Sequence, residues 1–131
     1  MAFNGVALFH QHIDRFAALE FDDRGGRIVT APFVFEGARL TLNVDAGATG
    51  EGRIALFEAD GKPIEGFGLD DCDIVNADWL DKTVSWRRGE YDLSALAGRP
   101  IRLEMRAHGV RLYSMQFTPN EGEPKLQVFK R

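Results

Sequence analysis

Arg39-Leu40-Thr41-Leu42-Asn43-Val44 is the stretch that decides the fold of this 131-residue chain. Its leucine and valine side chains alternate with polar ones, and alternate side chains of a β-strand point to opposite faces. The strand therefore buries one face and exposes the other to water. Three further stretches repeat or continue this pattern: Ile54–Glu58, Lys82–Trp86 and Ile101–Ala107.

Turn signals separate these stretches at short intervals. Asp60-Gly61 predicts a hairpin, because a tight primed turn needs positive φ at its central residues. A short helical turn is predicted at Asp92–Gly98, with Asp92 as its cap and Gly98 at its end. Several short strands between regular turns predict an all-β fold, namely a two-sheet antiparallel β-sandwich that is jelly-roll-like.

The predicted sandwich is one domain over residues 1–131, with residues 1–14 as an N-terminal extension and residues 118–131 as a C-terminal one. Ala7–Leu19 is a candidate helix, but Phe16–Phe21 also reads as a first strand, and we favour the strand. Leu126–Phe129 is a candidate for the last strand. No long helical crossover is visible, which disfavours a doubly wound α/β fold.

Composition narrows the classes of partner. The net charge is −4 and the basic residues are dispersed along the chain, whereas a nucleic-acid binder usually carries a basic stripe. No apolar run approaches the roughly 20 residues that span a bilayer. Neither nucleic acid nor membrane is therefore expected. Cys72 is the lone cysteine, which is compatible with the cytoplasm, and no signal peptide is visible, but localisation stays open.

Three segments carry a family resemblance: Ala59–Asp73, Tyr91–Leu103 and Val110–Phe117. Together they resemble the C-terminal β-sandwich module of large, mostly uncharacterised bacterial proteins built on a sialidase-like or fructan-hydrolase-like five-bladed β-propeller. The resemblance covers roughly Arg15 to Phe117. It implies a module without catalytic residues, because in such proteins the propeller carries the catalytic carboxylates.

The acidic cluster Asp70, Asp71 and Asp73 is the sharpest local feature. Carboxylates grouped in this way can hold Ca²⁺, which takes six to eight oxygen ligands. The alternative is a polar loop whose aspartates bond their own backbone. His10, His12 and His108 offer a weaker zinc alternative, since no third ligand is in register with the first two.

A glycan site is the second candidate. Trp79 follows polar residues and is expected to be exposed, where its flat face can stack on a sugar ring beside Asp71, Asp73 and Arg87. Trp86 ends an alternating stretch and is expected in the core instead. We also expect Cys72 to be a structural thiol, because neighbouring aspartates disfavour the thiolate.

These features predict a non-catalytic β-sandwich accessory or interaction module associated with carbohydrate-active proteins. Its expected ligands are a glycan, bound weakly, or a partner protein domain. No cofactor is expected except for the calcium alternative. Two other functions stay open: a small glycoside hydrolase-related or metal-dependent enzyme, and a structural subunit of a separately encoded catalytic chain.

Overall fold

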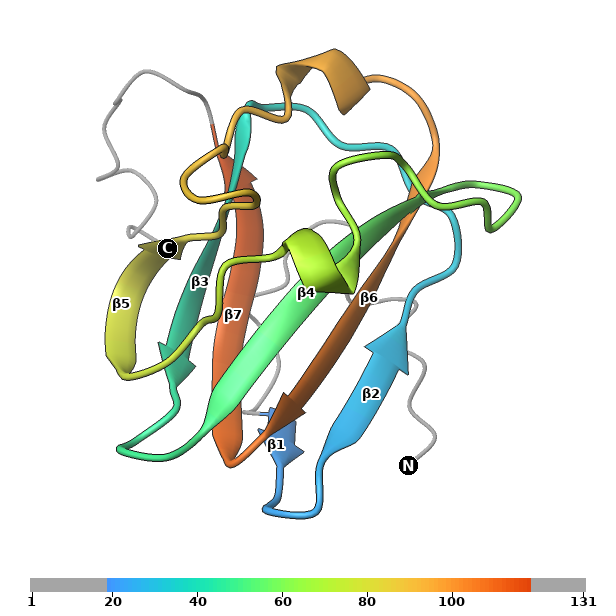
Figure 1. The fold of residues 1–131 in the computed structure, drawn as a ribbon. Helices are drawn as coiled ribbons and strands as arrows, with labels where there is room; N and C mark the ends of the chain where they lie inside the picture. The colour runs from blue at the N-terminus through green and yellow to red at the C-terminus, as the bar shows by residue number, and fades with distance from the viewer. Residues whose placement is uncertain (1–18, 119–131) are drawn as a thin grey trace.

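The computed structural model describes residues 19–118, which form two antiparallel sheets and two single 3₁₀ turns (Figure 1). One sheet has the order β1-β7-β3-β5 and the other β2-β6-β4. The strands are β1 (Leu19–Phe21), β2 (Gly26–Val29), β3 (Arg39–Asp45), β4 (Glu51–Glu58), β5 (Asp78–Thr83), β6 (Ile101–His108) and β7 (Val110–Thr118). The 3₁₀ turns are η3 (Leu69–Asp71) and η4 (Ser94–Leu96).

Successive strands alternate between the two sheets, so that odd-numbered strands form one layer and even-numbered strands the other. Every neighbouring pair within a sheet is antiparallel. Each connection between consecutive strands therefore passes from one sheet to the other, which is an arrangement typical of a jelly roll. The predicted all-β, two-sheet antiparallel sandwich is therefore confirmed.

The core lies between the layers and follows the alternation of the sequence. The inward side chains of the central strands are buried on both layers, which removes apolar surface from water. Those of the first sheet include Leu40, Leu42, Val44, Leu112 and Met115, and those of the second include Ile28, Ile54, Leu56, Leu103 and Met105. Trp86 also enters the core, is fully buried, and donates a hydrogen bond from Nε1 to the carbonyl of Ile54 at 2.9 Å.

The strand expected at Lys82–Trp86 lies earlier in the chain than the alternation suggests. Strand β5 is Asp78–Thr83, and the following Val84 and Trp86 reach the core from a loop. The backbone leaves the β3 ladder after Val84, whose N–H still bonds Leu40, and Trp86 then pairs with Cys72 and Glu90. Both expected core side chains are nevertheless buried.

Both predicted turns form, but the turn at Asp60-Gly61 is not of the primed type, because Gly61 has positive φ and Asp60 does not. Gly61 has φ of +95° and donates to the carbonyl of Glu58 at 2.9 Å, which closes the Asp60-Gly61 turn. The predicted helical turn is η4, which is shorter than predicted and has Leu93, not Asp92, at its N-cap. The Asp92 carboxylate accepts the Ser94 N–H, and Gly98 follows with positive φ.

The candidate helix Ala7–Leu19 lies outside the described residues except for Leu19, and the candidate strand Leu126–Phe129 lies wholly outside them. The two terminal extensions also lie outside them, except for Thr118.

Candidate functional site

A row of three arginines crosses the outer face of the β2-β6-β4 sheet. Arg106 of β6 lies opposite Arg27 of β2 on one side and opposite Arg53 of β4 on the other. Their chain neighbours Ile28, Met105 and Ile54 are buried, so the arginines point away from the core. Like charges placed directly opposite on neighbouring strands destabilise a sheet. The row therefore needs negative charge close by.

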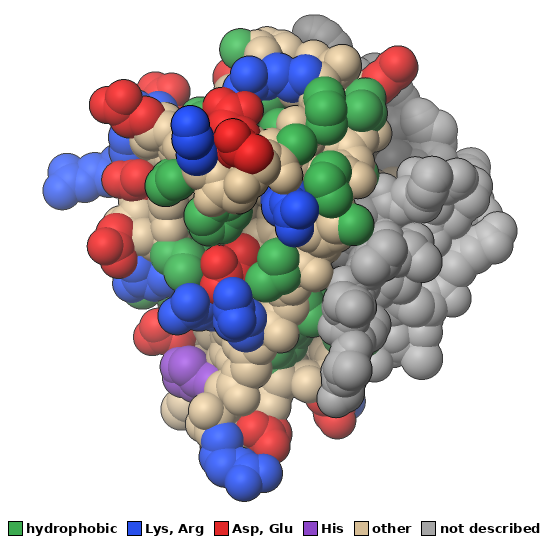
Figure 2. Space-filling model, turned by 90° about the vertical axis from the view of Figure 1, so that its right-hand side faces the viewer, with side chains coloured by type: hydrophobic (Ala, Val, Ile, Leu, Met, Phe, Trp, Pro, Cys, Tyr) green, Lys and Arg blue, Asp and Glu red, His purple; other side chains and the backbone are tan. Residues whose placement is uncertain are grey.

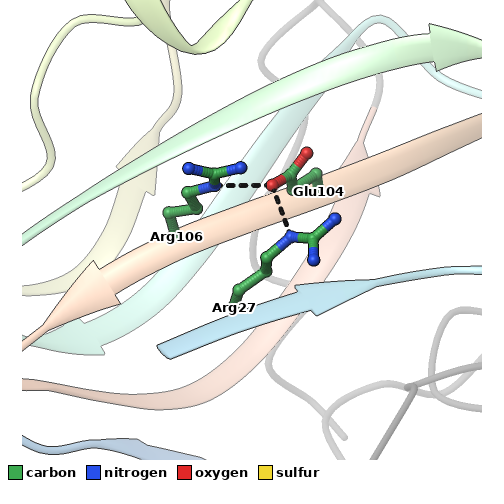
Figure 3. Close-up of polar contacts among 3 residues, drawn as sticks. All are labelled: Arg27, Glu104 and Arg106. Carbon is green, nitrogen blue, oxygen red and sulfur yellow. Dashed lines mark hydrogen bonds and ion pairs between the residues drawn. The ribbon is translucent and has the colours of Figure 1, made fainter. Parts of the chain in front are cut away.

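Glu104 supplies part of that charge from within the same face. Its Oε2 atom accepts hydrogen bonds from Nε of Arg27 at 2.9 Å and from Nε of Arg106 at 2.7 Å (Figure 3). The Glu104 side chain is only 7% exposed, whereas both arginine side chains are 57% exposed. Burial opposes ionisation of Glu104, but the hydrogen bonds from Arg106 and Arg27 outweigh it and lower the pKa of Glu104.

The arginine row lines an open depression with a volume of about 720 Å³. Three glycines, Gly25, Gly26 and Gly52, contribute to its lining. The residues around it are Asp23, Arg24, Gly25, Gly26, Arg27, Glu51, Gly52, Arg53, Leu69, Arg106, Ala107 and His108. Figure 2, which views the molecule from the β2 side, has basic and acidic side chains interspersed over the surface.

Positive and negative charges balance locally around this depression. Four arginines line it against two carboxylates, Glu104 beneath adds a third carboxylate, and Asp22, which pairs with Arg24 at 3.6 Å, adds a fourth. The chain as a whole carries −4. We name this surface the arginine face and define it by Arg24, Arg27, Arg53 and Arg106.

Of the site residues predicted from the sequence, Asp71, Asp73 and Arg87 lie together. The backbone N–H of Arg87 donates to the carbonyl of Asp71 at 2.7 Å. The Asp73 carboxylate accepts from the Ser85 hydroxyl at 2.6 Å and from the backbone N–H groups of Arg88 and Gly89 at 2.8 Å. Hydrogen bonding by Ser85 first, then by these two amides, lowers the pKa of Asp73.

Asp73 thereby holds a strained loop. Arg87 and Arg88 have φ of +49° and +64°, and Gly89 follows with +108°. Left-handed backbone costs roughly 1–2 kcal/mol for a residue with a Cβ atom. The Arg87 guanidinium lies 5.7 Å from the Phe67 ring centre and so close to Gly66 that a Cβ atom there would stand 2.8 Å from it. The contacts of Arg87 and Asp73 described here are therefore made within the chain and hold the loop in place.

Trp79 is exposed, as predicted, with 43% of its surface accessible. It lies on β5. Its Nε1 donates to the carbonyl of Asn76 at 2.6 Å, and the Lys82 ammonium lies 4.7 Å from its ring centre. Stacking of a sugar on Trp79 would have to use the face that Lys82 leaves open.

The three aspartates of the predicted calcium site face different partners. Asp70 is exposed, Asp71 accepts the Gly68 N–H at 3.0 Å, and Asp73 holds the loop at Arg88. Over residues 19–118, no group of three or more His, Cys, Asp or Glu side chains is placed to hold a metal ion. His10 and His12 lie outside those residues, and calcium or zinc binding stays a prediction.

Cys72 is buried beneath the acidic segment. Its thiol accepts the Ile54 N–H and donates to the Asp73 carbonyl, both at 3.3 Å. Burial is the main cause that raises the pKa of Cys72 to about 11, and the charge of Asp73 adds to it. The charge of the neighbouring aspartates, the cause expected from the sequence, is thus the lesser of the two. A buried thiol with this pKa is a poor nucleophile.

A second carboxylate pair lies on the other sheet. Asp45 of β3 and Asp78 of β5 are opposite each other. The hydrogen bond between them lowers the pKa of Asp45 and raises that of Asp78. Separated pKa values of this kind also occur in acid–base pairs of enzymes. Here the cause is the direct hydrogen bond between the two acids.

Comparison with known proteins returned no relative: no family model, curated protein or solved structure matches the chain. Among residues 19–118, no helix is long and apolar enough to cross a membrane. The class that the fold defines is thus a two-sheet β-sandwich, and the resemblance to propeller-associated modules stays a prediction.

The arginine face was not predicted from the sequence. Alternation alone indicates that Arg53 and Arg106 point outward, since each is followed or flanked by buried apolar residues. It does not indicate which strands are neighbours. The signal that was available is the run Arg102-Leu103-Glu104-Met105-Arg106, where an acid lies between two arginines on the outward face of one strand.

Proposed function

We propose that this chain is a non-catalytic β-sandwich module that binds carbohydrate through the arginine face. The observation that carries the proposal is the depression of about 720 Å³ along the Arg27, Arg106 and Arg53 row. Ligand pockets of proteins measure roughly 300–1,000 Å³. Resemblance to modules that accompany carbohydrate-active propellers supports the same class of ligand.

The chemistry of the depression suits a sugar. Guanidinium groups donate several hydrogen bonds in fixed directions, and the carboxylates of Asp23 and Glu51 accept them from hydroxyl groups. Leu69 and Ala107 also belong to the lining and offer apolar contact beside these polar groups. A rigid sheet holds the donors in place, which reduces the entropy lost on binding.

A glycan array followed by amide chemical-shift mapping of the full chain tests this function. We expect binding of at least one carbohydrate class, with the largest shifts on β2, β4 and β6. Shifts that cluster around Trp79, Asp71, Asp73 and Arg87 would favour the site predicted from sequence instead. Absence of any carbohydrate binding at millimolar concentration, with and without Ca²⁺, would contradict the function.

Metal analysis separates this function from the metal-dependent enzyme. The protein is purified without chelator and its bound metals are measured by mass spectrometry. We expect less than one tenth of an equivalent of any divalent metal. If the protein holds a stoichiometric metal and hydrolyses a substrate with it, the binding-module hypothesis is wrong and the protein is a metal-dependent enzyme.

A second candidate function, contact with a partner protein domain, is supported by β5. Among the described strands, β5 ends its sheet, and an edge strand presents unpaired backbone groups. Leu80 on this strand is 83% exposed beside Trp79. Co-expression with the products of adjacent reading frames tests it: Leu80→Lys is expected to abolish a complex that Tyr91→Lys, at another exposed position, leaves intact.

A further inference from the structure

The arginine row keeps part of its hydrogen-bonding capacity free. Glu104 engages only the Nε atoms of Arg27 and Arg106, which lie along one edge of each guanidinium (Figure 3). Over the described residues, no hydrogen bond engages the Nη atoms of these two side chains. Arg53 uses one, since its Nη1 donates to the carbonyl of Leu69 at 3.3 Å. Donors thus remain on all three residues.

Glu104 also fixes the positions of these donors. A carboxylate that is nearly buried and accepts from two arginines restricts the rotation of both side chains. Arg53 is fixed independently by the Leu69 carbonyl. Donors that are held before binding lose less entropy on binding than freely rotating ones. The row therefore differs from a set of solvated surface cations.

The charge of the arginine row indicates the charge of a ligand that would bind to it. Three arginines in register repel one another. Among the described residues, Glu104 is the carboxylate that hydrogen-bonds to the row, so two of its three positive charges are offset only by Asp23 and Glu51, which line the same depression without a hydrogen bond to the row. An anion in the depression would relieve this repulsion. Guanidinium forks bind carboxylate, sulfate and phosphate groups through two parallel hydrogen bonds.

We propose that the Arg27–Arg106–Arg53 row binds an oxyanion group of an acidic carbohydrate, either a carboxylate or a sulfate ester. This inference rests on the proposed function, because it names the class of sugar that the arginine face takes. The net charge of −4 disfavours a long polyanion such as nucleic acid, which would also meet the acidic remainder of the surface.

Calorimetric titration of the full chain with matched oligosaccharides tests the inference. The probes are an oligogalacturonate, its methyl ester, a sulfated galactan oligosaccharide, its desulfated form and a single-stranded oligonucleotide. We expect the carboxylated or the sulfated probe to bind, and its neutral counterpart to bind at least tenfold more weakly. Which of the two acids binds distinguishes a carboxylate site from a sulfate site.

Lysine variants separate fork recognition from simple attraction between charges. Arg27→Lys and Arg53→Lys each keep the positive charge but lose the fork, so we expect roughly tenfold weaker binding of the acidic probe. Arg99→Lys, a matched change at an exposed residue between η4 and β6, should leave binding unchanged. Thermal unfolding of each variant shows that the fold is kept.

Several results would overturn the inference. Equal binding of acidic and neutral probes on the arginine face would contradict recognition of an oxyanion, but it would still support carbohydrate binding by this face. Unchanged binding by both lysine variants would place the anion elsewhere. If the oligonucleotide binds more tightly than every carbohydrate, the ligand of the arginine face is a nucleic acid and not an acidic carbohydrate. If no carbohydrate binds, both the inference and the proposed function fail.

Discussion

Trp86 shows how much one side chain contributes to this fold. It is fully buried, its ring meets Phe67 edge-on at 5.1 Å, and its indole N–H donates to the Ile54 carbonyl. Trp86→Ala removes the packing and leaves that carbonyl unpaired, so we expect a loss of about 3–5 kcal/mol in the free energy of unfolding. Urea denaturation followed by circular dichroism measures it.

Trp79→Ala is the matched control, because Trp79 is 43% exposed on the edge strand. We expect that change to cost under about 1 kcal/mol, as surface substitutions usually do. Equal losses for the two variants would mean that burial does not distinguish the two tryptophans in solution.

Glu104 makes stability depend on pH. Because its pKa is lowered in the folded state, the ionised carboxylate stabilises the fold above the ordinary glutamate pKa of about 4.3, and this contribution is lost as pH falls through the folded value. Glu104→Gln is therefore expected to cost about 1–3 kcal/mol at pH 7 and less near pH 3. Urea titrations at both pH values measure the difference.

Glu58→Gln is the control for that experiment. Glu58 pairs with Arg99 at 3.4 Å and is 37% exposed, so its removal should change stability by under about 0.5 kcal/mol at either pH. A loss for Glu104→Gln that stays constant between pH 7 and pH 3 would show that packing, and not charge, accounts for it.

The loop after β5 is an element whose strain can be measured. Arg88 holds φ of +64°, a conformation that glycine adopts without a Cβ penalty. Arg88→Gly is therefore expected to stabilise the protein by about 0.5–1 kcal/mol, since Asp73 still receives the same two backbone N–H groups. Arg99→Gly, at a residue without positive φ, should be neutral or destabilising. Destabilisation by Arg88→Gly would mean that the arginine side chain itself holds the loop.

At the level of strands, alternation predicted the central part of the sandwich well. The stretches around Leu42, Ile54 and Leu103 form β3, β4 and β6, because each buries one face and its period of two is visible in the chain. Strand β5 was displaced, since Lys82–Trp86 combines the end of a strand with a loop that inserts Trp86. The burial of Val84 and Trp86 was predictable from the alternation, but the end of the strand at Thr83 was not.

Register explains why the candidate site was harder to predict than the fold. Arg27, Arg53 and Arg106 come from three strands that are far apart in the chain, and only the pairing of β2 and β4 with β6 aligns them. Pairing partners depend on contacts across the whole domain. Local features such as Asp73 and Trp79 were visible in the sequence. Their roles in holding a loop and lying on an edge became visible only in the structure.

For the molecule as a whole, the two sheets carry different outer surfaces. The β2-β6-β4 sheet presents the arginine face, while the other sheet presents the Asp45–Asp78 pair and the Glu20–Arg111 ion pair at 2.6 Å. An acidic protein that gathers arginines on one face has an uneven field, which orients anionic ligands toward that face. This asymmetry favours binding on one side of the sandwich.

The last prediction concerns catalysis by the full chain. Glycoside hydrolysis needs two carboxyl groups roughly 5–9.5 Å apart on either side of the scissile bond. Asp45 and Asp78 have separated pKa values, but they bond directly to each other, which is too close for a sugar to enter between them. We therefore expect no turnover of chromogenic glycosides or sialosides above the buffer rate, with or without Ca²⁺ and Zn²⁺, and a known glycosidase serves as positive control.

Activity that copurifies with the protein would contradict this prediction, and single variants would then locate its source. Loss of that activity in Asp78→Asn would assign it to the acid pair, because the amide cannot titrate but keeps the shape of the side chain. Loss in Glu51→Gln would assign it to the arginine face, where Glu51 lies among the arginines. In the second case the oxyanion bound by the row would be part of a substrate, and the same surface would both bind and cleave its ligand.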